Sequence, residues 1–287
     1  MQRATIARFA TAILFTCSAA VLLAGQQLPG EPQHTSGASI TPAFEGWFNN
    51  PDGTKTLLIG YYNRNRTEEI DIPIGANNHF EPGPADRGQP THFLTGRQWG
   101  VFGITVPKDF PPRQEVTWVL SANGQQLKVP FYLHNDYEIA PFVGIQNNTP
   151  PVLRFVESGP SAQGPLDLTI ERETPKSTPL PLTVFVTDDG KSSSAAARVP
   201  ANRDLVTVTW AKYRGPGAVT FDNAKPKAEK TSAEGAPTFT GKATTNAKFD
   251  EPGDYTLQVT INDLSGVGGG GFQCCWTTGL VKVTVKP

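Results

Sequence analysis

Two adjacent cysteines near the C-terminus could carry redox chemistry. Cys274 and Cys275 follow a glycine-rich run at 266–271 and precede Trp276. Neighbouring Cα atoms lie ~3.8 Å apart across a trans peptide, whereas a relaxed disulfide prefers ~4.4–6.8 Å. Three states are therefore open: a disulfide between the neighbours, two buried thiols, or a bridge to another molecule. A bridge between the neighbours either stiffens a turn or forms a redox or ligand-gripping loop.

Carboxylates at the ends of two expected strands could bind a cation. Asp188 and Asp189 end one strand, and Asp263 ends another. Calcium takes about six to eight oxygen ligands, which three carboxylates and backbone carbonyls could supply in part. Aspartate and glycine at strand ends are also ordinary turn residues. Calcium is the one candidate cofactor, and otherwise we expect none.

The histidines give no sign of a metal or catalytic site. Those that follow the first 25 residues show no i,i+2 or i,i+4 spacing: His34, His79, His92 and His134. A Ser-His-Asp triad needs no fixed spacing, but the G-x-S-x-G stretch of many hydrolases is missing. We therefore predict no catalytic residues and no enzymatic activity.

Aromatic residues are the best indication of a binding surface. They flank the turn at 50–53 and a long irregular stretch at 75–98. Rings that point out of a strand can stack on sugars or contact a partner, whereas rings that point inward build the core. The candidate ligand-binding residues are Trp47, Tyr61, Tyr62, His92, Phe93 and Trp99.

Strands must position these residues. Glycine and proline make up 28 + 26 = 54 of the 287 residues, and both break helix interiors. Apolar and polar residues alternate at 206–210, 255–261 and 281–285, which predicts strands with one buried face. Trp210 falls on the buried face of its strand.

The strands group into two clusters. A polar leader at 26–40 precedes the first cluster, 41–145, and a turn-rich linker at 141–151 leads to the second, 149–287. We expect an all-β protein with two β-sandwich domains in series. The first domain matches no family pattern that we recognise.

The second domain resembles the polycystic-kidney-disease-type (PKD-like) Ig-like repeats of bacterial surface and secreted proteins. The resemblance lies in VTVTWAKYRGPGAVTF at 206–221 and AKFDEPGDYTLQVTINDLSG at 247–266. The WDFGDG-like stretch of better-known members is missing, and insertions fall around 190–203 and 223–238. The resemblance implies an Ig-like sandwich that serves as a spacer or as an adhesion or binding module, without catalysis. Independently, Tyr255 opens a strand after a Pro-Gly turn, where a tyrosine corner would lie.

The first 25 residues predict export. Arg3 and Arg8 precede an uncharged, mainly apolar run at 9–25, which is the layout of a signal peptide. A retained anchor is the alternative, although the run is short for a membrane span. After cleavage we expect no membrane span and a periplasmic or extracellular location.

The charge balance argues against nucleic acid as a partner. The chain has a net charge of −1, and removal of two arginines with the signal leaves 23 − 26 = −3. Nucleic-acid binders usually carry a strong basic excess.

The sequence therefore predicts an exported, non-catalytic binding or structural module for envelope polysaccharide or a protein partner. The alternatives are a secreted enzyme with a site between the domains, or a redox or metal accessory protein that uses the cysteine pair. A cleft that gathers His92, Arg87 and Asp86 would favour an enzyme. A dish of aromatic residues would favour binding.

Overall fold

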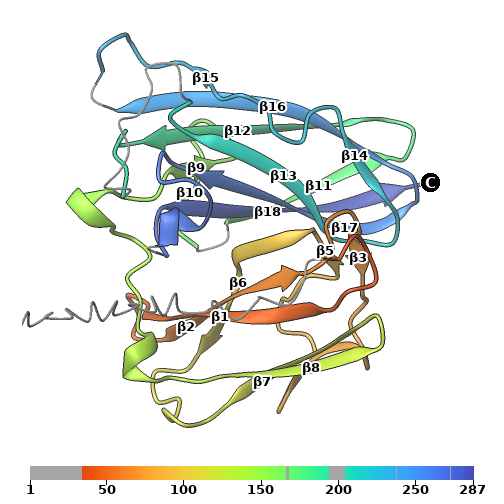
Figure 1. Ribbon diagram of the computed structural model, residues 1–287. Helices are drawn as coiled ribbons and strands as arrows, with labels where there is room; N and C mark the ends of the chain where they lie inside the picture. The colour runs from red at the N-terminus through yellow and green to blue at the C-terminus, as the bar shows by residue number, and fades with distance from the viewer. Residues whose placement is uncertain (1–33, 166–167, 194–203, 237, 272) are drawn as a thin grey trace, which may run out of the picture. The chain divides into compact units, whose positions relative to one another are not determined.

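The all-β prediction is confirmed by the computed structural model, which describes residues 34–287 apart from 166–167, 194–203, 237 and 272 (Figure 1). Within that part of the chain the only helical elements are short 3-10 turns: η1 (Asn135–Tyr137), η2 (Ile145–Asn147) and η3 (Val267–Gly271). No helix there is long and apolar enough to span a membrane.

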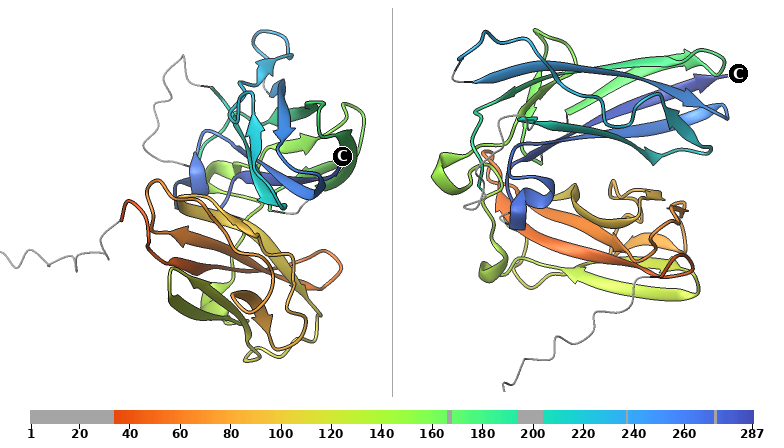
Figure 2. Two further views of the ribbon diagram at one scale, coloured as in Figure 1. Left: turned by 90° about the vertical axis from the view of Figure 1, so that its right-hand side faces the viewer. Right: turned by 45° about the horizontal axis from the view of Figure 1, so that its top comes forward.

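The N-terminal half contains two antiparallel three-stranded sheets and a short ribbon (Figure 2). The first sheet has the order β1 (Ile40–Asn49), β2 (Lys55–Asn63) and β6 (Gly96–Val106). The second has the order β4 (Asn78–Glu81), β7 (Val116–Ala122) and β8 (Gln125–Phe131). The ribbon pairs β3 (Ile70–Asp71) with β5 (His92–Phe93).

The two N-terminal sheets share one core, to which both contribute aromatic rings. Trp118 of β7 is fully buried, and Phe80 of β4 stacks on it with ring centroids 5.6 Å apart. Phe102 of β6 meets Trp118 edge-on at 5.3 Å. The stretch at 75–98, which the sequence predicts to be irregular, supplies β4 and β5 and places Phe80 and Phe93 in this core.

The C-terminal half contains two larger sheets. One has the order β10 (Ser161–Gln163), β9 (Val152–Arg154), β12 (Leu180–Asp188), β16 (Phe239–Phe249) and β14 (Val219–Phe221), with β15 (Glu229–Lys230) also paired to β16. The other has the order β11 (Leu168–Pro175), β18 (Trp276–Lys286), β17 (Gly253–Asn262) and β13 (Thr207–Arg214). The pairing of β11 with β18 is parallel.

The core of the C-terminal half follows the alternation seen in the sequence. Trp210, only 2% exposed, packs in one cluster with inward residues of both large sheets, among them Val184 and Leu257. Tyr255 is also buried, and its hydroxyl donates a hydrogen bond to the carbonyl of Glu251 (2.9 Å) and accepts one from the N–H of Gly217 (3.1 Å). The tyrosine therefore ties the turn before β17 to the segment after β13.

The end of β13 packs into the N-terminal core. A bulge between Lys212 and Arg214 shifts the register with β17. Tyr213 is buried in the same cluster as Trp118, and its hydroxyl donates to the carbonyl of Gly88. Arg214 makes two hydrogen bonds to the carboxylate of Asp86, at 2.8 and 2.9 Å. One strand of the C-terminal half thus helps to complete the N-terminal core.

Candidate functional site: an exposed aromatic face

Three of the predicted ligand-binding aromatics lie in the core. Trp47, Tyr61 and Phe93 are almost wholly buried. The Trp47 indole donates to the carbonyl of His134 (2.8 Å), and the Tyr61 hydroxyl accepts from the N–H of Leu94 (2.8 Å). These three rings have no free face for a ligand because they are buried among other side chains. The polar atoms of Trp47 and Tyr61 are also already hydrogen-bonded within the protein.

Tyr62 and Trp99 are partly exposed, but each ring already has a cation beside it. The Arg64 guanidinium lies 5.3 Å from the centroid of Tyr62, and the Arg97 guanidinium lies 4.0 Å from that of Trp99. The backbone of Gly268 also packs on Trp99, so closely that a Cβ there would come within 2.7 Å of the ring. Neither ring presents an open platform of the expected kind.

His92 is held between two carboxylates. Its Nδ1 lies 3.0 Å from Asp71 and its Nε2 lies 3.1 Å from Glu69, with the side chain 11% exposed. Burial lowers the pKa of His92, but the hydrogen bonds and negative charges of Asp71 and Glu69 outweigh burial and hold that pKa above its usual value. Both ring nitrogens can donate only in the imidazolium form, which is not a general base.

The residues that would have favoured an enzyme do not gather. Asp86 pairs with Arg214, and Arg87 donates to the carbonyl of Pro82 (2.8 Å), whereas His92 is bound to Asp71 and Glu69. Asp86, Arg87 and His92 therefore do not form the shared cleft that would have favoured an enzyme.

A different set of rings forms an exposed group on the N-terminal half. We call it the aromatic face, and its members are Phe44, Tyr132, His134 and Tyr137. Tyr137 meets Tyr132, His134 and Phe44 with centroids 5.6–5.9 Å apart. Tyr137 is 44% exposed, and His134 is exposed beside it. The neighbouring Tyr137 side chain raises the pKa of Tyr132, chiefly through side-chain hydrogen bonding.

Two hollows adjoin the aromatic face. The larger has a volume of ≈ 690 Å³ and the smaller ≈ 440 Å³, and Tyr132 and Asp136 border both. Hydrogen-bonding side chains line the larger hollow: Arg113, Glu115, His134, Asn135 and Asp136. The smaller hollow is lined by aromatic and apolar groups, Phe44, Pro130, Tyr132, Tyr137 and Ile139, together with Glu45, Asp136 and Gln273. Ring faces and polar groups therefore stand side by side at the surface.

The aromatic face was not among the predicted binding residues, although the sequence contains a signal for it. Phe131 and Leu133 are buried, so in the run FYLHNDY the intervening Tyr132 and His134 point outward. The turn η1 then places Tyr137 against them. Period-2 alternation applied to 131–134 would have identified two outward rings two residues apart.

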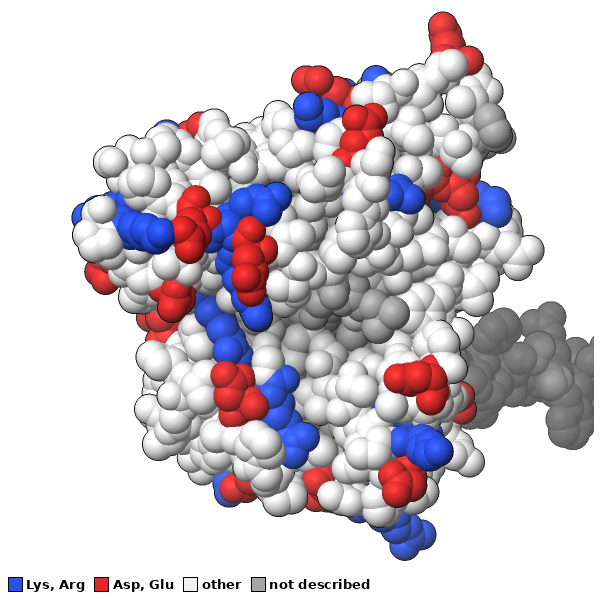
Figure 3. All heavy atoms as spheres, turned by 180° about the vertical axis from the view of Figure 1, so that it is seen from behind, with Lys and Arg blue, Asp and Glu red and all other residues white. Residues whose placement is uncertain are grey.

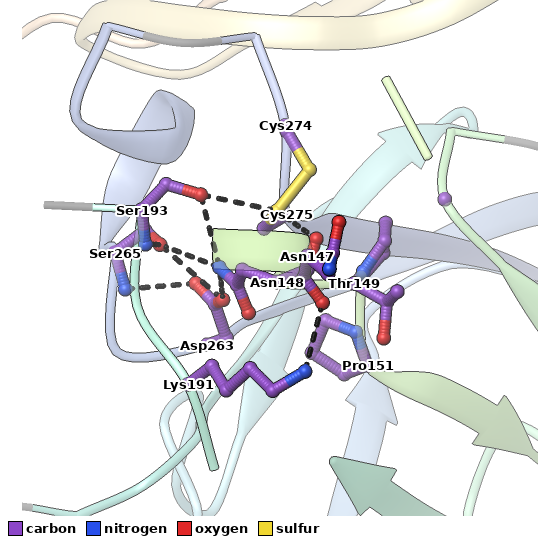
Figure 4. The surroundings of a disulfide bond; sticks show 12 residues. Asn147, Asn148, Thr149, Pro151, Lys191, Ser193, Asp263, Ser265, Cys274 and Cys275 are labelled. Atoms are coloured by element: carbon purple, nitrogen blue, oxygen red, sulfur yellow. Dashed lines mark hydrogen bonds between the residues drawn. A yellow bond between two sulfur atoms is a disulfide. The ribbon is translucent and has the colours of Figure 1, made fainter. Parts of the chain in front are cut away.

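The adjacent cysteines form a disulfide bond within the C-terminal half (Figure 4). Of the three open states, the structure contains the bridge between neighbours. Cys274 and Cys275 are 1% and 0% exposed, so the bridge is not a ligand-gripping surface. Because Cys275 Sγ carries no proton in the disulfide, the Ser193 hydroxyl 3.7 Å away is the donor in that contact.

A buried polar network lies beside the bridge (Figure 4). The amide of Asn148 donates to Asp263 Oδ2 (2.6 Å) and lies 3.1 Å from the hydroxyls of Ser193 and Ser265. Ser265 accepts from the N–H of Ser193 (2.8 Å). Asn148 lies in the linker between the two halves. Its side chain therefore ties this linker to two loops of the C-terminal half, one that contains Ser193 and one that contains Asp263 and Ser265.

Of the calcium candidates, Asp263 belongs to this network, and Asp188 and Asp189 lie near it. Burial raises the pKa of Asp188 to about 7; the N–H of Gly190 opposes the shift, and the charges of Asp263 and Asp189 add to it. Asp189 instead accepts from the N–H and hydroxyl of Thr149. Among the described residues, no group of three or more His, Cys, Asp or Glu side chains is placed to hold a metal ion.

Charges on the surface are mixed. Figure 3 shows one face of the molecule, where Lys and Arg side chains lie next to Asp and Glu and much of the surface is uncharged. That face offers no broad basic surface to a phosphate backbone.

Comparison with known proteins adds no relative. No protein-family model matches this sequence, and the curated proteins include none that is similar to it. The resemblance of 206–221 and 247–266 to PKD-type repeats therefore stays a prediction.

Proposed function

We propose that this protein is an exported, non-catalytic binding module that attaches to polysaccharide through the aromatic face. The observation that supports it most is the exposed contact group of Tyr132, His134 and Tyr137 beside a hollow lined with polar side chains.

The chemistry of the aromatic face suits a sugar ring. The face of an aromatic ring carries partial negative charge, and the C–H bonds on one side of a pyranose ring are weakly positive, so the two stack. Sugar hydroxyls both donate and accept hydrogen bonds. Arg113, Asn135 and Asp136 offer donors and acceptors within the adjoining hollow.

Export and the domain identities belong to the same proposal. A signal peptide at 1–25, which lies outside the described residues, would deliver the chain to the periplasm or beyond. We further propose that 41–145 and 149–287 are two β-sandwich domains and that the second is Ig-like, with Trp210 as its core tryptophan and Tyr255 as its tyrosine corner. Sequencing of the N-terminus of exported protein tests the first of these points, since a chain that starts at Met1 contradicts cleavage.

Binding to polysaccharide tests the aromatic face directly. Purified protein is incubated with insoluble cellulose, chitin and peptidoglycan, and the bound fraction is measured against protein concentration. Tyr137→Ala and Tyr132→Ala should each weaken binding about tenfold or more, which corresponds to ~1.4 kcal/mol.

Phe185→Ala is the matched control. Phe185 is a partly exposed ring on β12, beside Lys242 and outside the lining of both hollows. The control should bind as the wild type does. Absence of binding to every polymer, or an equal loss in the control, contradicts the proposal, and capture of a protein partner at Tyr137 would replace it.

A further inference from the structure

A third cavity lies apart from the aromatic face. It has a volume of ≈ 790 Å³ and is bordered by the segment from β5 into β6 and by side chains of β13 and β17. That volume falls in the range of ~300–1,000 Å³ typical of small-molecule sites. We call it the β13–β17 cavity, and it shares no lining residue with either hollow at the aromatic face.

The β13 and β17 side of this cavity presents short neutral polar groups. Thr209 and Thr260 are paired residues on the two antiparallel strands, so their side chains lie on the same side of the sheet. Both are partly exposed, and neither hydroxyl has a hydrogen bond to another residue in the part of the chain that the structure describes. Gln258, two residues from Thr260, is fixed by donation from its amide to the carbonyl of Val101 (2.8 Å).

The charged groups at one end of the cavity are already paired. Lys212 is nearly buried and lies 2.9 Å from Asp71, which also binds His92, and His92 binds Glu69. Arg97 pairs with the buried Glu45 at 2.6 Å. At this end of the cavity a charged ligand would have to break one of these pairs, whereas a neutral ligand would not.

Two tryptophans on the border have unused donors. The indole N–H groups of Trp210 and Trp276 are buried, and neither has an acceptor among the described residues. A buried donor without a partner costs about 1–3 kcal/mol. Trp210 points into the C-terminal core, on the opposite side of β13 from Thr209, so only Trp276, which pairs with Asn262 on β17, lies on the side of the threonines.

We infer that the β13–β17 cavity binds a small, uncharged, hydroxyl-rich molecule, of the chemical class of a neutral disaccharide. The site is independent of polysaccharide attachment at the aromatic face. Val101, Ala211 and Val219 supply apolar groups, and the threonine hydroxyls and the side-chain carbonyl oxygen of Gln258 supply hydrogen bonds.

The test uses the full exported chain and three soluble probes, cellobiose, maltose and N,N′-diacetylchitobiose. Binding is detected by saturation-transfer NMR and measured by calorimetry. At least one probe should bind with a Kd below about 10 mM, and the double variant Thr209→Val/Thr260→Val should weaken it at least tenfold, because valine keeps the shape and β-propensity of threonine but lacks the hydroxyl.

Two controls separate the outcomes. Thr183 and Thr244 are likewise paired threonines on two antiparallel strands, β12 and β16, away from the cavity. The double variant Thr183→Val/Thr244→Val removes their hydroxyls and should leave the Kd unchanged. Tyr137→Ala should also leave it unchanged, since that residue serves the aromatic face. No binding of any probe, an equal effect of both threonine pairs, or loss of binding in Tyr137→Ala overturns the inference, whereas failure of polymer binding alone affects only the proposed function.

Discussion

Asp188 shows how a single buried carboxylate can set the pH dependence of stability. Its pKa is raised to about 7 by burial, and its Oδ2 has no hydrogen-bond partner in the described residues. Because the folded chain holds this proton more tightly than the unfolded chain, stability from this group is full below about pH 4 and is lost as pH rises toward 7.

Asp188→Asn should therefore stabilise the protein at pH 8. Asparagine keeps an oxygen for the N–H of Gly190, which now donates to Asp188 Oδ1 at 2.8 Å, and removes the buried charge. We expect a gain on the order of 2–4 kcal/mol at pH 8 that vanishes near pH 4, measured by urea unfolding with a chelator present. Asp222→Asn, at an exposed site where pairing with Lys248 lowers the pKa, should give no such gain.

The cysteine pair gives a second prediction for individual residues. Intact mass after alkylation under denaturing, non-reducing conditions should show a monomer without added alkyl groups, because the two sulfurs are bonded to each other. Uptake of two alkyl groups would indicate free thiols, and a dimer that reduction splits would indicate an intermolecular bridge. Replacement of both by serine should hardly change the stability through chain entropy, since the bridge closes almost no loop.

Sequence patterns predicted individual residues unevenly. Trp210 and Tyr255 could be placed in the core because alternation fixes which face of a strand is buried. Trp47, Tyr61 and Phe93 could not be separated from surface rings, since the sequence does not say which face of an N-terminal strand is covered. Tyr137 belongs to the aromatic face because the short turn η1 brings it back against Tyr132 and His134. The spacing of apolar residues in the sequence does not predict the course of such a turn.

At the level of elements, the His92 cluster joins three strands. His92 of β5 binds Asp71 of β3, and Asp71 binds Lys212 of β13. The raised pKa of His92 means that its contribution to stability is present below its unfolded pKa of ~6.5 and is lost as pH rises through the folded value. The two carboxylates that face His92 are Asp71 of β3 and Glu69, the residue before β3, and the pKa of each is lowered.

His92→Gln should remove this dependence. At pH 5.5 the variant should be less stable than the wild type by about 1–3 kcal/mol, the range for hydrogen bonds to charged groups. The difference should shrink at a pH above the folded pKa, where the wild-type ring is neutral. Thermal unfolding across that range measures it, and a difference that does not vary with pH would show that the ring acts only by packing.

At the level of the whole molecule, the two halves are connected by more than the linker. The prediction of strand clusters at 41–145 and 149–287 rested on local patterns, and those patterns say nothing about contacts between clusters. Tyr213 lies three residues after Trp210, so alternation along β13 turns it away from the C-terminal core, and there it is buried in the N-terminal core. The alternation shows which way Tyr213 points but not that the N-terminal half covers that side of the strand.

Tyr213→Ala should therefore destabilise the N-terminal half through a residue of the C-terminal half. Truncation of a buried aromatic ring costs about 3–5 kcal/mol. Exchange of the amide hydrogens of β7, around Trp118, should speed up in the variant under native conditions. Val156→Ala, at an exposed position, is the control and should leave the exchange of β7 unchanged. Faster exchange confined to β13 and β17 would contradict this view.

The depth of the disulfide also limits when it can form. Gly144 and Ser193 pack against Cys275, and both cysteines are buried, so the described residues shield the sulfurs from an oxidant once the chain has folded. Oxidation must therefore happen early, while the chain is still open, or wait for a local opening of the native state. The order in which a newly made chain meets its oxidant and completes its fold would then decide which redox form of the protein accumulates.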